Sequence, residues 1–167
     1  LVLDWDLTKG SLSDQSASGF NATVGGTPYF DYSEKGRVMD FDGAGDYLKT
    51  GDVALMTAQT TVSIWVKISE TASGYLFVGR NGDPYFSGYI SGTGLQIQCL
   101  TGSPHDLKFT YTFADNTWHH LVMIRNGDDS ANLKIYMDGI ARTGVTTGNI
   151  GVGIGINALF SNGTTTH

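Results

Sequence analysis

The stretch that decides the fold runs from Trp118 to Gly139. It reads Trp-His-His-Leu-Val-Met-Ile-Arg at 118–125, Asn-Gly-Asp-Asp-Ser-Ala-Asn at 126–132 and Leu-Lys-Ile-Tyr-Met-Asp-Gly at 133–139. Two runs rich in β-branched, Met and aromatic residues flank a polar segment, which predicts an antiparallel hairpin with a long loop. Asp138-Gly139 is a tight-turn dipeptide, so a further strand is expected directly after it.

Alternate positions divide each strand of this hairpin into two faces. In the first strand, positions 118, 120, 122 and 124 share one face, and positions 119, 121, 123 and 125 share the other. Both strands have a mainly apolar side, as the inner sheet of a sandwich requires. We expect His120 on the packed side beside Val122, with its imidazole hydrogen-bonded.

Similar short runs recur along the chain between turns rich in Gly, Asn, Asp, Pro or Ser. The predicted strands cover residues 2–7, 20–24, 29–32, 38–42 (resuming at 46–49), 60–68, 75–79, 85–90, 95–100, 107–113, 118–125, 133–137, 140–145 and 150–156. A helical turn is expected only at 52–58, with Asp52 as its cap. The pattern predicts an all-β fold, an antiparallel two-sheet jelly-roll sandwich, with residues 1–167 as a single domain.

Composition excludes several classes of function. The net charge is −6, and no basic run interrupts the acidic surface, so nucleic acid is not expected as a partner. No segment approaches ~20 consecutive apolar residues, so membrane insertion is not expected. Cys99 is the only cysteine, so there is no disulfide framework. Of the 16 acidic residues, 14 are Asp, which fits turns and also fits oxygen-ligand cation sites.

Four ordered motifs carry a resemblance to a known family. They are Met39-Asp40-Phe41-Asp42-Gly43-Ala44-Gly45-Asp46-Tyr47-Leu48, Thr61-Val62-Ser63-Ile64-Trp65-Val66-Lys67, Trp118-His119-His120-Leu121 and Leu133-Lys134-Ile135-Tyr136-Met137-Asp138-Gly139. Together with the loop at 14–21, they resemble the laminin G-like branch of the concanavalin A-like lectin/glucanase superfamily. The resemblance implies that the three tryptophans, Trp5, Trp65 and Trp118, are core residues rather than ligand platforms.

The chain departs from the family at its C-terminal end. The family closes with a strand that reads like "GxIDDVRIY", whereas this sequence stops at residues 160–167, where that strand should follow. The domain is therefore expected to lack its final strand, or to have that edge filled by another subunit or by an adapted strand. An open sheet edge is a pairing hazard that natural sheets usually cover.

Catalysis is not expected, so the domain is predicted not to be an enzyme. Glucan-cutting relatives use a Glu-x-Asp-x-x-Glu constellation, which this sequence lacks. Asp40 and Asp42 alternate, but they lie in the structural "FDG" motif and lead into a turn. No Gly-x-Ser-x-Gly elbow is present. Adjacent strand residues point to opposite faces, so His119 and His120 cannot converge on one metal ion.

The resemblance also implies a calcium ion at the rim of the sandwich. Related folds hold Ca²⁺ with Asp and Asn side chains and loop carbonyls, and here the candidate ligands are Asp14, Asp42 and Asp46. The alternative is that Asp42 and Asp46 cap the turn that contains them.

A carbohydrate site is the other candidate. Sugars bind aromatic rings through their apolar faces and hydrogen-bond to Asp and Asn side chains. One predicted hairpin mixes these groups, and its candidate binding residues are Asn81, Asp83, Tyr85 and Tyr89. Ser87 between the two tyrosines is expected to leave an accessible surface, and Tyr75 and Tyr111 are candidates to lie nearby. Ordinary sheet packing is the competing role for these tyrosines.

The leading hypothesis is a non-catalytic, lectin-like recognition module that binds carbohydrate or a glycosylated surface. It would belong to a larger protein with an extracellular, cell-surface or virion-surface location. The alternative is a structural or adhesion domain of a larger assembly, such as a viral capsid, a tail fibre or a bacterial surface protein. That domain would contact other subunits through its C-terminal edge and would have no small-molecule site. A hydrolase ranks third.

Overall fold

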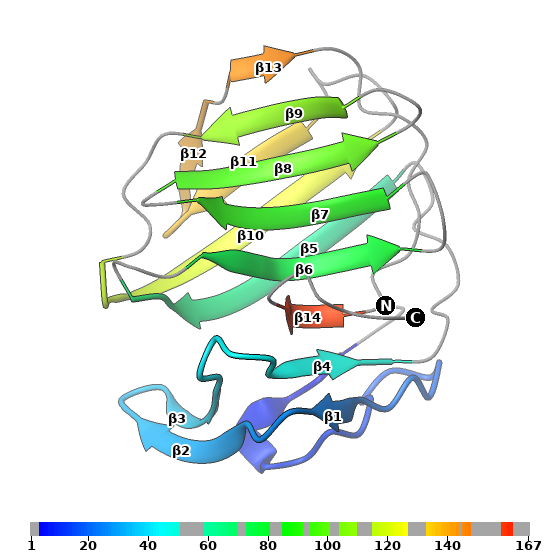
Figure 1. Ribbon diagram of the computed structural model, residues 1–167, viewed down its shortest axis with the longest axis vertical. Coiled ribbons are helices and arrows are strands. Elements are labelled where there is room, and N and C mark those ends of the chain that lie inside the picture. The colour runs from blue at the N-terminus through cyan, green and yellow to red at the C-terminus, as the bar shows by residue number, and fades with distance from the viewer. Residues whose placement is uncertain are drawn as a thin grey trace.

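The chain folds into antiparallel β-sheets, two of which stack on each other, as the computed structural model shows (Figure 1). The structure describes residues 4–50, 59–69, 73–80, 85–91, 94–100, 104–109, 115–126, 133–143, 145–147 and 158–161. Strands dominate these residues, and the one helix among them is the short 3-10 helix η1 (Leu7–Lys9), so the all-β prediction is confirmed. Nowhere in these ranges is there a helix with the length and apolar character needed to span a membrane.

The four-stranded sheet contains the predicted hairpin. Its order is β12-β11-β10-β5, formed by β12 (Ile140–Arg142), β11 (Leu133–Met137), β10 (Trp118–Asn126) and β5 (Gln59–Lys67). Strand β10 lies between two antiparallel partners, because Leu121 pairs with Met137 of β11 and with Ile64 of β5. The sequence segment that best predicted a hairpin is therefore the centre of one layer.

Asp138 and Gly139 form the tight turn between β11 and β12. Their φ angles are 55° and 77°, and Met137 pairs with Ile140 across the turn. Two successive positive φ angles define a two-residue type I′ turn, whose twist matches that of antiparallel strands. The predicted turn and the strand after it are confirmed.

The larger sheet has eight strands and forms the other layer. Its order is β1 (Thr23–Gly25), β4 (Tyr47–Lys49), β14 (Ala158–Ser161), β6 (Gly74–Arg80), β7 (Tyr85–Ser91), β8 (Gly94–Leu100), β9 (Pro104–Phe109) and β13 (Val145–Thr147). In Figure 1 this sheet lies in front of the four-stranded sheet. Buried apolar side chains from both layers form the core: Leu48, Phe77, Ile90, Leu95, Leu121, Met123, Leu133, Ile135 and Met137.

The buried side of β10 is the opposite of the side on which we expected His120. Leu121, Met123 and Arg125 are buried, with Arg125 only 1% exposed. His120 therefore lies on the outer face, where it is half-buried. Both faces of this strand are apolar enough to pack, so alternation alone did not identify the inner one. The predicted hydrogen bond of His120 is confirmed, since its Nε2 lies 2.9 Å from Ser63 Oγ.

The predicted opening strand at 2–7 is wrong for its described part. Trp5 forms a single β-bridge with Asp14, and η1 begins at Leu7. The Asp6 carboxylate caps this helix by accepting a hydrogen bond from the Thr8 N–H. Asp is a strong N-cap residue, and this local bond competes with strand pairing. Val2 and Leu3 lie outside the described residues.

Two predicted strands are each divided between different sheets. Residues 38–42 and 46–49 were expected to be one interrupted strand, but β3 (Gly36–Asp40) pairs with β2 (Tyr29–Ser33), whereas β4 joins the eight-stranded sheet. Residues 140–145 likewise contain β12 and part of β13, which belong to opposite layers. Strand partners are chosen by long-range contacts that periodicity does not report. The expected helical turn at 52–58 and strand at 150–156 lie outside the described residues.

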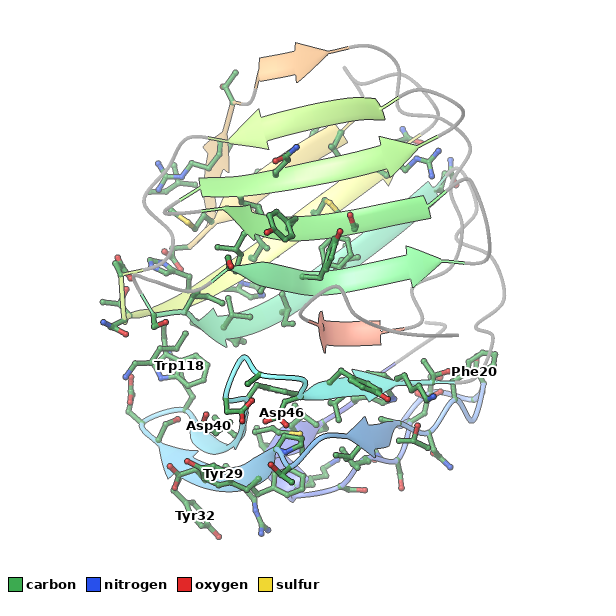
Figure 2. The ribbon with its side chains drawn as sticks, viewed as in Figure 1. Phe20, Tyr29, Tyr32, Asp40, Asp46 and Trp118 are labelled. Atoms are coloured by element: carbon green, nitrogen blue, oxygen red, sulfur yellow. The ribbon has the colours of Figure 1, made fainter. Side chains whose placement is uncertain are left out.

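One strand has no counterpart among the predicted strands. Strand β14 lies between β4 and β6, where Leu159 pairs with Leu48 and with Phe77. The predicted strands at 29–32 and 38–42 correspond to β2 and β3, which form a separate two-stranded sheet beside the sandwich. Figure 2 shows Tyr29 and Tyr32 on the β2–β3 hairpin. The two residues are 59% and 75% exposed.

Candidate functional site

The predicted carbohydrate-binding tyrosines lie on β7 and its neighbour β6. Tyr89 pairs with Tyr75, and their rings meet edge to face with centroids 4.9 Å apart. The structure therefore confirms that Tyr75 lies near Tyr89. Ser87, which we expected to leave an accessible surface, is instead fully buried. Half-buried Tyr89 is thus involved in sheet packing, as the competing interpretation held.

The remaining members of that predicted site are not described. Asn81 and Asp83 lie outside the described residues, as does Tyr111. Tyr85 begins β7 and pairs with Arg80 and Leu100, but its side chain is outside the description. Sugar binding by Asn81, Asp83, Tyr85 and Tyr89 remains a prediction.

Asp14 organises the loop after the first turn. Its Oδ1 accepts hydrogen bonds from the Asp4 and Ser16 N–H groups, both at 2.9 Å. Its Oδ2 accepts from Ser16 Oγ at 2.8 Å and from the Phe20 N–H at 2.9 Å. Desolvation raises the pKa of Asp14, but the bonds from Ser16, Asp4 and Phe20 outweigh it and lower the pKa to about 2. Each oxygen has both lone pairs occupied by donors, so a cation would have to displace them.

Asp46 and Asp42 act as caps of their turn. Buried Asp46 accepts from the Thr27 N–H at 2.7 Å and from the Asp42 N–H at 3.0 Å, which ties the β3–β4 turn to the segment after β1 (Figure 2). Asp42 accepts from the Ala44 N–H at 2.7 Å. Within the described ranges, His, Cys, Asp and Glu form no group of three or more suited to a metal ion. Calcium binding by Asp14, Asp42 and Asp46 remains a prediction.

The sequence interpretation of Trp65 as a core residue is wrong. Trp65 is 49% exposed and lies on the outer face of β5. Its ring stacks on that of His120, with centroids 4.9 Å apart and planes inclined by 19°. The two residues are register partners on β5 and β10, so the pair is built into the sheet. The alternation of β5 already contained this signal, because Trp65 shares a face with Ser63 and Lys67 rather than with the apolar positions.

We call the outer surface of the four-stranded sheet the Trp65 face. Besides Trp65 and His120, it carries Ser63 and the half-buried Val122 and Tyr136, since Val122 pairs with Ser63 on one side and Tyr136 on the other. Neighbouring strands lie about 4.8 Å apart, so these side chains form a continuous surface of rings, a methyl-bearing side chain and a hydroxyl. A ligand with a flat apolar face can stack on such a surface and can form hydrogen bonds with polar groups at the margin of the surface.

A histidine between two carboxylates holds the backbone beneath this face. His119 Nδ1 lies 2.7 Å from Asp138 Oδ2, and its Nε2 lies 3.1 Å from Asp115 Oδ1. Asp138 Oδ1 also accepts from the His120 N–H at 2.9 Å. Both carboxylates can only accept, so both ring nitrogens donate when the histidine is protonated. The cluster ties the start of β10 to the β11–β12 turn and thereby positions His120.

The pKa values of His119, Asp138 and Asp115 shift in the directions expected when a histidine forms ion pairs with two carboxylates. Burial lowers the pKa of His119, but its bonds to Asp138 and Asp115 raise it more, and the net shift is upward. Burial raises the pKa of Asp138, but the His119 and His120 bonds lower it overall. Bonds from the Thr117 side chain and N–H hold the pKa of Asp115 below its usual range. In mildly acidic solution, His119 is therefore protonated while Asp138 and Asp115 are ionised.

Comparison with solved structures places this architecture among known folds. Domain 4 of AbnA, a GH43 extracellular arabinanase from Geobacillus stearothermophilus solved with arabinotriose, is 19% identical with a TM-score of 0.74, and the match covers 97% of this chain and 84% of that one. The binding domain of Paraclostridial Mosquitocidal Protein 1 is 11% identical with a TM-score of 0.71, covering 92% and 42%.

A third similar structure comes from a study of ganglioside-dependent cell entry by botulinum neurotoxin type C. It is 14% identical with a TM-score of 0.69, and the match covers 99% of this chain and 44% of that one. The present chain thus spans less than half of each of these last two chains. At these identities the likeness concerns the fold alone. No curated protein sequence matches the chain significantly.

The profile of one protein family matches most of the sequence. That family is described as the concanavalin A-like lectin/glucanases superfamily, and the match covers residues 42–161. This range includes β4 to β14 and therefore both layers of the sandwich. The chain belongs to the concanavalin A-like lectin/glucanases superfamily.

Proposed function

We propose that this domain is a non-catalytic carbohydrate-binding module that holds sugars against the Trp65 face. The observation that carries the proposal is the 49% exposure of Trp65 on a regular strand, with its ring fixed by His120. An indole held in this way loses little conformational freedom on binding, which favours affinity. Its apolar ring suits the apolar face of a pyranose or furanose ring.

The surroundings of Trp65 supply the polar part of such a site. Ser63 is exposed, and its hydroxyl shares a hydrogen bond with His120 Nε2 while keeping capacity for a second partner. Tyr136 on β11 adds a second aromatic ring with a hydroxyl. Few well-placed polar groups around an apolar platform are typical of sites that bind small molecules.

The similar structures support a carbohydrate ligand. One was solved with arabinotriose, and another concerns a toxin whose entry depends on two ganglioside molecules. Both likenesses rest on the fold, so they support the class of ligand. The exposed Trp65 is the basis for placing the binding surface on the four-stranded sheet. We further propose that the module is part of a larger extracellular or surface-exposed protein, as the arabinanase domain is.

Thermal melts with a panel of soluble polysaccharides test this function. A ligand present at a hundred times its Kd should raise the free energy of unfolding by about 2.7 kcal/mol, which shifts the melting temperature by a few degrees. The shift should disappear in Trp65→Ala. It should persist in Tyr29→Ala, a matched control that removes an exposed ring from the β2–β3 hairpin. A structural or adhesion domain, the alternative, predicts no shift with any polysaccharide.

A further inference from the structure

The four-stranded sheet carries an unusual distribution of charge. None of the residues in β5, β10, β11 and β12 is Asp or Glu, although the chain has 16 acidic residues and a net charge of −6. Lys67 on β5 and Lys134 on β11 are exposed, and register places both on the Trp65 face. Lys67 lies two residues beyond Trp65, a separation of about 7 Å along the strand.

A third lysine approaches the same ring from another sheet. Lys35 lies in the turn between β2 and β3, and its Nζ is 4.0 Å from the centroid of the Trp65 ring. This is a cation–π contact at an exposed site, which is worth about a 2- to 5-fold change in an equilibrium constant. The exposed Glu34 is its neighbour in the turn. Asp138, in the turn between β11 and β12, is bonded to His119 and to the His120 N–H.

The position of Lys35 affects which sugar can stack on Trp65. A sugar that covers the ring face must move the ammonium group aside and loses the cation–π contact. A neutral sugar has no charged group that could form an ion pair with the displaced ammonium. A sugar with a carboxylate at its edge can accept the displaced ammonium as an ion-pair partner, while Lys67 adds a second positive charge nearby.

From these observations, we propose that the Trp65 face binds sugars that bear a carboxylate, with the sugar ring on Trp65 and the carboxylate at Lys35 and Lys67. This inference rests on the proposed function, because it names the ligand class of the same site. The chemistry is shared by uronic acids and by sialic acids, which carry the carboxylate at different ring positions. The experiment below separates the two sources.

Titration calorimetry with matched ligand pairs tests the preference. One pair is trigalacturonate and α-1,4-linked galactotriose; the other is sialyllactose and lactose. In at least one pair, the acidic ligand should bind at least about fivefold more tightly than the neutral one, and the pair in which this occurs identifies the source. The preference should weaken as sodium chloride is raised, because exposed charge pairs are screened.

Charge-removing variants locate the preference. Lys35→Met combined with Lys67→Met should abolish it, while the neutral ligand's affinity should not fall and should rise by up to about fivefold, because the sugar no longer has to displace Lys35 from Trp65. Lys49→Met is the matched control, because Lys49 is also exposed and its Nζ lies over an aromatic ring, 5.9 Å from the Tyr47 centroid, but on the eight-stranded sheet. The control should keep the preference.

Three results overturn this inference: equal affinity within both pairs, a preference that survives loss of Lys35 and Lys67, or no binding to either member of either pair. The proposed function is judged separately. If a neutral polysaccharide still gives a Trp65-dependent thermal shift, the module binds sugar without a carboxylate preference, and only the inference fails.

Discussion

His120 stacks on Trp65 with ring centroids 4.9 Å apart and planes inclined by 19°, and both rings lie on the outer face of the smaller sheet. The contact follows from register, since the two residues are directly opposite each other on antiparallel strands. Cross-strand aromatic pairs of this kind stabilise a sheet and restrict the motion of both rings. Trp65 is therefore exposed and held in place at once, which is the basis of the proposed binding platform.

Replacing His120 by Ala should weaken sugar binding without unfolding the domain. Loss of the ring contact removes about 0.5–1.5 kcal/mol and lets the Trp65 ring move, so affinity should fall about 2- to 10-fold. Val122→Ala is the control, since Val122 lies on the same strand and face without stacking on Trp65. Calorimetry of both variants provides the measurement. Equal losses in both would show that the stacked contact has no special role.

The His119 cluster should give the domain a stability optimum in mildly acidic solution. The raised pKa of His119 makes its contribution complete below the ordinary value of 6.5 and lost as the pH rises through the folded-state pKa. The lowered pKa of Asp138 makes its contribution complete above the ordinary value of 3.8 and lost as the pH falls through the folded-state pKa. The cluster should therefore stabilise most between about pH 4 and 6.5.

Chemical denaturation across this pH range checks the cluster. His119→Gln removes the charge and should cost about 1–3 kcal/mol at pH 5.5, because bonds between charged groups are lost in a part-buried place. The cost should shrink as the pH rises above 6.5 and through the folded-state pKa of His119. His120→Gln is the matched control, since the imidazole of His120 stacks on Trp65 and does not lie between two carboxylates. A cost for His119→Gln that does not vary with pH would contradict the ion-pair account.

Asp14 should stabilise the N-terminal loop with or without calcium. Its carboxylate accepts four hydrogen bonds within the chain, so Asp14→Ala should cost about 1–3 kcal/mol. Because the pKa is lowered to about 2 from an ordinary value of 3.8, this contribution should be complete above about pH 4 and be lost as the pH falls toward 2. Thermal melts with calcium and with a chelator provide the measurement. A calcium-dependent stabilisation that disappears in Asp14→Ala would instead support a cation site.

The sequence predicted which segments form strands and turns better than it predicted which strands pair with each other. Strand periodicity identified the hairpin of β10 and β11, and the Asp138-Gly139 dipeptide identified the turn from β11 into β12, because those features depend on neighbouring residues. It did not show that β3 and β4 join different sheets, nor that β14 lies between β4 and β6, since both depend on contacts between distant segments. The expected first strand is also wrong, because the Asp6 carboxylate caps a short 3-10 helix at this place.

The candidate site was only partly predictable, for a related reason. Alternation along β5 placed Trp65 with Ser63 and Lys67, but its position in a family motif favoured a core role that the 49% exposure contradicts. The approach of Lys35 to Trp65 links two sheets and has no local signal. Ser87 shows the converse, because a polar residue between two tyrosines is fully buried in the structure.

The central claim is that Trp65, rather than Tyr89, carries sugar binding. Calorimetric titration of wild type, Trp65→Ala and Tyr89→Ala with the polysaccharide that gives the largest thermal shift tests it most directly. The account predicts that Trp65→Ala weakens binding at least about tenfold, the equivalent of 1.4 kcal/mol, while Tyr89→Ala binds as wild type. Full affinity in Trp65→Ala with binding lost in Tyr89→Ala would contradict it and move the site to the β6–β7 hairpin.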